Sequence, residues 1–161
     1  METKVYVGTY AKYNNGSIAG EWLTLSDYAD KEEFLQACKE LHEDEEDAEF
    51  MFQDIDGEHF GMIAESYIDE ELFELINSLD ESDAEVYAAF RKHFDGDWNA
   101  CQDAYSGKYE SDEDFAQDMA EQCGMLQDRV SWPYTCIDWG QAAADLMYDY
   151  IEEDGYYFRN C

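Results

Sequence analysis

Hydrophobic and polar residues alternate at the start of the chain in the manner of short strands. Lys4–Tyr10 and Ile18–Leu25 are rich in β-branched and aromatic residues, and the turn signal Asn14-Asn15-Gly16 lies between them. Glu49–Ile55 is a third strand candidate and ends at Asp56-Gly57. These three segments predict a small antiparallel sheet.

A helical period separates the second and third of these strands. Asp30 followed by Glu33 is a capping-box pattern, which marks the start of a helix. Apolar residues then recur at helical spacing, at Phe34, Leu35, Cys38 and Leu41. The N-terminal part of the chain is therefore predicted to combine its sheet with one helix, followed by an acidic loop.

The period is helical from about Tyr67 onward. One apolar stripe holds Ile68, Leu72, Leu75, Ile76 and Leu79. Ser82 with Glu85 is a second capping-box pattern, and Asp97 begins a short further helix. This middle part is predicted to be helical as far as about Asp103.

The last third mixes both periods. Tyr105–Tyr109 indicates a turn or strand, after which Ser111 caps a helix that carries Phe115, Met119 and Cys123 on one side. A final helix is predicted from Asp138 to Tyr150, with inward-facing Trp139, Ala142, Leu146 and Tyr150. Asp154-Gly155 then turns into a last strand, Tyr156–Phe158. The predicted fold class is α+β, with small domains at residues 1–61 (sheet and helix), 62–103 (helical) and 104–161 (mixed α/β).

Composition adds an unusual charge to this folded pattern. The 161 residues are 45% hydrophobic and 16% aromatic, which is too rich in core material for acidic disorder, yet the formal net charge is −32. A small domain needs a net charge of only about 2–8 for solubility. Nucleic acid is excluded as a direct partner and anionic membranes are disfavoured, because both require basic residues. Basic protein surfaces and cations remain.

The acids cluster most densely between Glu40 and Phe90. That window holds 19 acids and no Lys or Arg. Repulsion among like charges costs stability, so a fold that keeps such a field is expected to use it on a positively charged partner. The candidate partner-binding acids are Glu40, Glu43, Asp44, Glu45, Glu46, Asp47, Glu49, Asp54, Asp56, Asp69, Glu70, Glu74, Asp80, Glu81, Asp83, Asp112, Glu113, Asp114, Asp118, Glu121, Asp145 and Asp149.

Cysteine usage and hydropathy predict a cytoplasmic protein. The five cysteines are odd in number, widely spaced and without a CxxC pair, which favours reduced thiols over a disulfide framework or a zinc site. METKVYVGTY has no features of a secretory signal. No apolar run approaches the roughly 20 residues of a membrane span.

Motifs for catalysis or cofactor binding are not evident in the sequence. Asp54-Ile55-Asp56-Gly57 resembles an EF-hand fragment, but Phe52 and Ile63 would occupy the first and last ligand positions and cannot chelate. The histidines form no HxxxH pattern, and no GxSxG, P-loop or dinucleotide motif occurs. We therefore predict no enzyme activity, no cofactor and no dedicated metal site.

Carboxylates at this density resemble a phosphate backbone. Duplex DNA carries about one charge per 1.7 Å of axis, so 32 charges correspond to roughly 54 Å of duplex. A compact sphere would not spread its charges in this way. The charge pattern therefore predicts an elongated chain that imitates a stretch of DNA.

Particular segments resemble the ArdA family of antirestriction proteins. They are VYVGTYAKYNNGSIAGEWLTLSDY (Val5 to Tyr28), ELHEDEEDAEFMFQD (Glu40 to Asp54) and the closing GYYFRN (Gly155 to Asn160). The acidic middle is compatible too, so the likeness spans essentially the full chain, with Ala48 standing where the family often has proline.

The resemblance implies a DNA mimic carried by conjugative plasmids or transposons. Such a protein would occupy the DNA-binding groove of type I restriction–modification enzymes, on their methyltransferase core. The family likeness also implies three small domains in an elongated monomer, and a homodimer formed through the C-terminal region.

Two other functions fit the same charge. An acidic, solubility-adapted protein would fold better in molar salt and would not bind DNA-binding proteins. A histone-chaperone-like protein would bind many basic partners without blocking a DNA groove.

Overall fold

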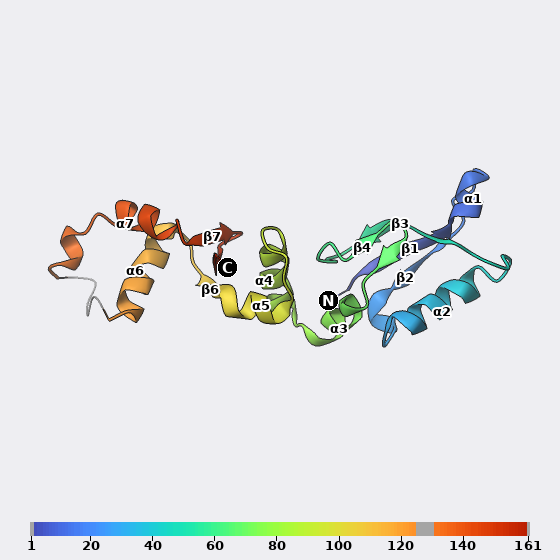
Figure 1. The fold of residues 1–161 in the computed structure, drawn as a ribbon, viewed down its shortest axis with the longest axis horizontal. Coiled ribbons are helices and arrows are strands. Elements are labelled where there is room, and N and C mark those ends of the chain that lie inside the picture. The colour runs from blue at the N-terminus through green and yellow to red at the C-terminus, as the bar shows by residue number, and fades with distance from the viewer. Residues whose placement is uncertain (1, 125–130, 161) are drawn as a thin grey trace. The chain divides into compact units, whose positions relative to one another are not determined.

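The computed structural model describes residues 2–124 and 131–160 and has a mixed α+β fold (Figure 1). The chain forms two compact units, Met1–Ala88 and Ala89–Cys161. Each unit contains a three-stranded antiparallel sheet, in the orders β2-β1-β3 and β6-β8-β7. The α+β fold class is thus confirmed, whereas the division into three domains stays a prediction.

The first unit is built on a central strand. β1 (Lys4–Thr9) pairs antiparallel with β2 (Glu21–Thr24) on one side and with β3 (Phe50–Asp56) on the other. Val5 and Val7 are fully buried while Lys4 and Tyr6 are half-buried, which is the period of two expected of a strand with one face in the core. All three predicted N-terminal strands are confirmed.

Helices and a small hairpin complete the first unit. After β1 comes the short helix α1 (Tyr10–Asn14), and a 3₁₀ turn, η1 (Leu25–Asp27), follows β2. The other elements are α2 (Lys31–Leu41), β4 (Ile63–Ala64), β5 (Tyr67–Ile68), α3 (Glu71–Ser78) and α4 (Glu81–Arg91), the last of which continues across the unit boundary.

Aromatic rings join these elements into one core. The ring of Phe34 on α2 lies 5.9 Å from that of Phe52 on β3 and 5.7 Å from that of Phe73 on α3. All three side chains are buried, and Phe60 packs on Tyr87 at 4.9 Å. Burial of an aromatic side chain contributes roughly 1.5–3 kcal/mol, so this core opposes the repulsion among the surface acids.

In the second unit, helices α5 and α6 pack against the sheet β6-β8-β7. Its elements are α5 (Trp98–Ala104), β6 (Tyr105–Lys108), α6 (Asp112–Gln122), η2 (Tyr134–Cys136), α7 (Trp139–Leu146), β7 (Tyr150–Glu153) and β8 (Tyr156–Arg159). Phe115 of α6 stacks on Tyr157 of β8 at 4.5 Å, and both are buried. The predicted last strand, with its buried Tyr156, Tyr157 and Phe158, is confirmed.

The predicted helix starts are largely confirmed. The side chain of Asp30 accepts a hydrogen bond from the Glu33 amide at 2.9 Å, and Asp97 and Ser111 cap α5 and α6 in the same way. The second capping box is wrong, because α4 begins one residue before Ser82 and the Asp80 carboxylate accepts from the Asp83 amide at 2.9 Å.

Three predicted residue positions are wrong. Ile68 pairs with Ile63 in the β4–β5 hairpin and is no part of a helix. The last helix ends at Leu146, and Tyr150 begins strand β7. Cys123, predicted to lie on one side of the helix with the now buried Phe115, comes just after α6 and is exposed.

Candidate acidic binding surface

The densest acids form a loop between α2 and β3, residues 43–49, which we call the acidic loop. His42 caps the end of α2 and is buried, with 2% exposure. The loop is fixed at both ends by backbone bonds: the Glu45 amide donates to the His42 carbonyl at 3.0 Å, and the Tyr10 amide donates to the Glu49 carbonyl at 3.0 Å. The acids of the loop therefore project from a defined backbone.

Carboxylates of the acidic loop divide into two kinds. Asp44 pairs with the ammonium of Lys12 at 2.8 Å, and Glu45 accepts from the Thr9 hydroxyl at 2.7 Å. The hydrogen bond between Lys12 and Asp44 lowers the pKa of the carboxyl and raises the pKa of the ammonium. Within the described part of the chain, the exposed side chains of Glu43, Glu46 and Asp47 make no hydrogen bond or ion pair. These three are available to a partner.

Further acids of the first unit follow the same division. Asp69 is half-buried and accepts from both the Tyr67 hydroxyl and the Glu71 amide, and Asp80 is occupied as a helix cap. The exposed side chains with no such bond to any residue that the structure describes are those of Glu49, Asp56, Glu70, Glu74, Glu81 and Asp83. Glu40 and Asp54 are exposed and bond only to near neighbours in the sequence.

In the second unit, two acids of α6 hold tyrosines. Asp112 accepts from the buried Tyr157 hydroxyl at 2.6 Å, and Asp118 accepts from Tyr109 at 2.8 Å. Burial, followed by these carboxylates, raises the pKa of Tyr109 to about 12 and moves that of Tyr157 in the same direction.

The remaining candidate acids of this unit lie at or near its surface. Asp114 accepts from the Ser111 hydroxyl, and Asp145 accepts from the Gln141 amide side chain. Glu113 and Asp149 are exposed, and Glu121 is half-buried. None of the candidate acids in either unit is buried, so each has a face toward solvent.

Basic residues do not neutralise this surface, because most of those described engage local partners. Lys92 pairs with Glu153 and Asp154, both at 2.7 Å, which raises its pKa. Lys31 lies 5.1 Å from the centre of the Tyr67 ring, and Lys108 lies 4.2 Å from that of Tyr156. Since the chain has 9 Lys and Arg against 41 Asp and Glu, most carboxylates keep their field.

One cluster that the sequence did not predict joins the acidic loop to β1 and α1. It consists of Thr9, Lys12, His42, Asp44 and Glu45, and we call it the Lys12 cluster. Ligand-type atoms of His42, Asp44 and Glu45 lie within 4.8 Å of one another, a spacing that a metal ion would accept. The Lys12 ammonium lies 2.9 Å from Nδ1 of His42 and 2.8 Å from Asp44, so the chain's own cation occupies this position. Lys12 and His42 are 30 residues apart in sequence, and no local pattern links them.

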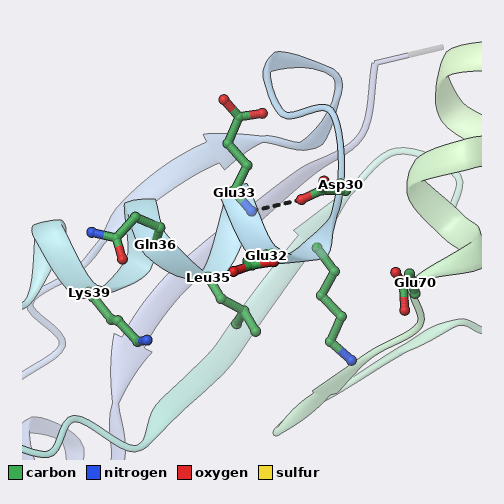
Figure 2. A pocket seen from close by; sticks show the side chains of 8 residues that line it. Asp30, Glu32, Glu33, Leu35, Gln36, Lys39 and Glu70 are labelled. Carbon is green, nitrogen blue, oxygen red and sulfur yellow. Dashed lines mark hydrogen bonds between the residues drawn. The ribbon is translucent and has the colours of Figure 1, made fainter.

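A groove of about 690 Å³ lies along α2 and reaches Glu70, just before α3 (Figure 2). Four carboxylates, two ammonium groups, Leu35 and Gln36 line it. Figure 2 shows that the Asp30 carboxylate is directed to the backbone of Glu33 as a helix cap. The lining includes no Ser, Cys or His that could act as a nucleophile or proton shuttle. The groove is therefore part of the charged surface and does not resemble an active site.

Comparison with models of protein families assigns this acidic chain to one family. The model of the antirestriction protein family ArdA matches residues 5–158. The chain belongs to the ArdA family. The match covers nearly the whole chain and includes the acidic loop, nearly all of the two three-stranded sheets and all of α6. A search of curated proteins gave no match.

Family membership confirms the expected antirestriction class. ArdA proteins act against restriction enzymes. In residues 2–124 and 131–160, no helix is long and apolar enough to cross a membrane.

Proposed function

We propose that this ArdA-family chain inhibits type I restriction–modification enzymes by occupying their DNA-binding groove. Its exposed carboxylates take the places of DNA phosphates against the Lys and Arg of the methyltransferase core. The observation that carries the proposal is the set of exposed acids that have no partner among the described residues, in the acidic loop, in α3 and α4, and at Glu113 of α6. Acids that served the fold alone would be engaged as Asp69 and Asp112 are.

Many weak contacts act together in this proposal. An exposed ion pair contributes about 0–1 kcal/mol, so no single acid is expected to be essential. Affinity arises from the number of contacts and falls steeply as salt screens them. The protein needs no cofactor for this role. The C-terminal part, residues 104–161, is proposed to form a homodimer, and the three small domains expected from the sequence are part of the same proposal.

A competition assay tests the proposal. A fluorescent duplex carrying the recognition site is bound to a type I methyltransferase core, and the protein is titrated in at several salt concentrations. We expect the duplex to be displaced competitively, with an apparent affinity that falls linearly on a log–log plot against salt. A ternary complex of enzyme, duplex and protein would refute groove occupancy.

Specificity separates this function from general binding of basic proteins. The same titration is repeated with lysozyme or a histone as the basic partner, at the same salt. We expect the methyltransferase core to bind far more tightly than either. Equal affinity for all three would favour the chaperone-like function instead.

A further inference from the structure

The Lys12 cluster connects the acidic loop to α1 and to the end of the central strand β1, with a single ammonium group at its centre. Nζ of Lys12 lies 2.9 Å from Nδ1 of His42, 2.8 Å from Asp44 and 3.5 Å from Glu45. The Lys12 side chain is only 20% exposed. An ammonium has three donors, and the three neighbours match that number.

The orientation of His42 is set by its second nitrogen. Nε2 lies 3.2 Å from the carbonyl oxygen of Val7, and a carbonyl can only accept. Nε2 therefore carries the proton, and Nδ1 is left to accept from Lys12. A neutral, buried imidazole thus aims a lone pair at the ammonium and holds it beside the loop.

Thr9 adds a second attachment that carries no charge. Its hydroxyl donates to Glu45 at 2.7 Å and accepts from the Lys12 amide at 3.2 Å, as the cap of α1. The neighbouring Tyr10 amide holds the Glu49 carbonyl. Residues 9–12 therefore bond to the middle of the acidic loop, at Asp44 and Glu45, and to its end, at Glu49.

We propose that Lys12 is a positioning residue that orders the acidic loop for the target enzyme. This inference rests on the proposed function, since it concerns how the loop presents its free acids Glu43, Glu46 and Asp47. Without Lys12 the loop must be ordered during binding, and that ordering subtracts from affinity.

The sign of the effect distinguishes positioning from bulk charge. Replacing one Lys changes the net charge from −32 to −33, because −32 − 1 = −33. If only total charge mattered, a more negative protein would bind a basic groove more tightly. A positioning role predicts weaker binding in spite of the added negative charge.

The test compares Lys12→Met with Lys39→Met in the full chain. Lys39 is exposed on α2, and its substitution changes the charge equally. We expect Lys12→Met to inhibit about five- to tenfold less well than the wild type in the duplex competition assay. Its dependence on salt should also be shallower, by about one unit of slope for each lost contact. Lys39→Met should match or slightly exceed the wild type. Inhibition by Lys12→Met at or above the level of Lys39→Met would overturn the proposal.

Hydrogen exchange of backbone amides measures the order of the acidic loop directly. In Lys12→Met, the amides of Tyr10 and Glu45 should exchange at least tenfold faster, while the β1 amides paired to β3 stay protected. Unchanged exchange at both amides would overturn the positioning role. This readout does not need the target enzyme, so failure of the wild type to displace DNA would refute only the proposed function.

A second variant, which leaves the net charge unchanged, tests the proposal even if Lys12→Met fails to fold. Thr9→Val keeps the shape and the net charge while it removes the hydroxyl that donates to Glu45 and caps α1. We expect the same faster exchange at the Tyr10 amide and an inhibition loss in the same direction, with Thr24→Val on β2 as the matched control. Wild-type exchange and inhibition in Thr9→Val would count against the proposal.

Discussion

Neutralising two sets of acids should separate stability from inhibition. Three substitutions in the acidic loop and three in helix α6 each change the net charge from −32 to −29. The loop variant is Glu43→Gln/Glu46→Gln/Asp47→Asn, and the helix variant is Asp112→Asn/Asp114→Asn/Asp118→Asn. If surface charge acts collectively, both should weaken inhibition to a similar, partial extent.

Their effects on folding should differ because only the helix acids bond within the fold. Asp112 and Asp118 accept tyrosine hydroxyls at 2.6 and 2.8 Å. Loss of the carboxylate charge leaves a neutral acceptor, which is about half as strong, and costs about 1 kcal/mol for each bond. Asp112 and Asp114 also lie in the first turn of α6, where each charge contributes about 0.3–1 kcal/mol. The helix variant should therefore lose about 2–4 kcal/mol of unfolding free energy.

The loop variant should be as stable as the wild type or slightly more stable. Its three side chains have no internal partner among the described residues, and exposed substitutions of this kind change stability by at most about 0.5 kcal/mol each. Relief of repulsion acts in the stabilising direction. Urea unfolding at pH 7 measures the free energies, and the duplex competition assay measures inhibition. The reasoning is refuted if the loop variant is destabilised as much as the helix variant. Complete loss of inhibition in the loop variant would indicate a local site and contradict collective action.

Three further predictions concern a helix cap, an ion pair and a thiol. Asp30→Ala should lower the free energy of unfolding by about 1 kcal/mol in urea, because the first turn of α2 loses its acceptor. The pKa of Glu153 is lowered, first by its hydrogen bond to Lys92, so the unfolded chain binds more protons than the folded one. Its stabilisation is therefore present above the ordinary value of 4.5 and is lost as pH falls through the folded pKa. Lys92→Met should flatten that part of the curve of thermal stability against pH. Burial raises the pKa of the Cys38 thiol to about 12, so iodoacetamide at pH 8 should label exposed Cys123 and spare Cys38, as peptide mass spectrometry will show.

Local patterns predicted the helix starts well, because a cap is a contact between residues three apart. Asp30 is correct even in its partner, the Glu33 amide. The reciprocal half of the box differs slightly, since the Glu33 carboxylate accepts from the Ala29 amide at 2.7 Å. At Asp80 the same physics applies two residues earlier than predicted. The error was one of register between Ser82 and Asp80, since both residue types can cap a helix.

Long-range pairing explains the elements that the sequence pattern missed. Tyr150 continues the helical stripe of Leu146, yet it pairs with Arg159 in the β7–β8 hairpin. The hairpin turn, Asp154-Gly155, was recognised, but only the strand after it was predicted. Asp154 has a φ of 54° and Gly155 of 83°, the left-handed pair that a two-residue hairpin loop requires. A turn with this geometry joins two antiparallel strands, so a strand is expected before it as well as after it.

The candidate site was predictable in composition but not in its internal division. Exposure of the acids follows from their number, since a core cannot hold unpaired carboxylates. Whether a given acid is engaged depends on distant residues: Tyr157 is 45 positions from Asp112, and Lys12 is 32 from Asp44. Such pairs leave no periodic trace in a single sequence.

The placement of acids along the helices explains how a small fold tolerates this charge. The N-terminus of a helix carries about half a positive charge, which stabilises carboxylates in the first turn by about 0.3–1 kcal/mol each. Helices α2, α3, α4 and α6 all have acids in that turn, and acidic side chains cap α2, α5 and α7. First-turn side chains such as Glu81 and Glu113 remain exposed. A carboxylate placed there still repels its neighbours, but the partial positive charge of the helix N-terminus offsets part of that repulsion. Its side chain stays exposed and can contact a partner. The chain can therefore present a dense negative surface at a lower cost in stability than the same acids would have at the C-terminal ends of helices.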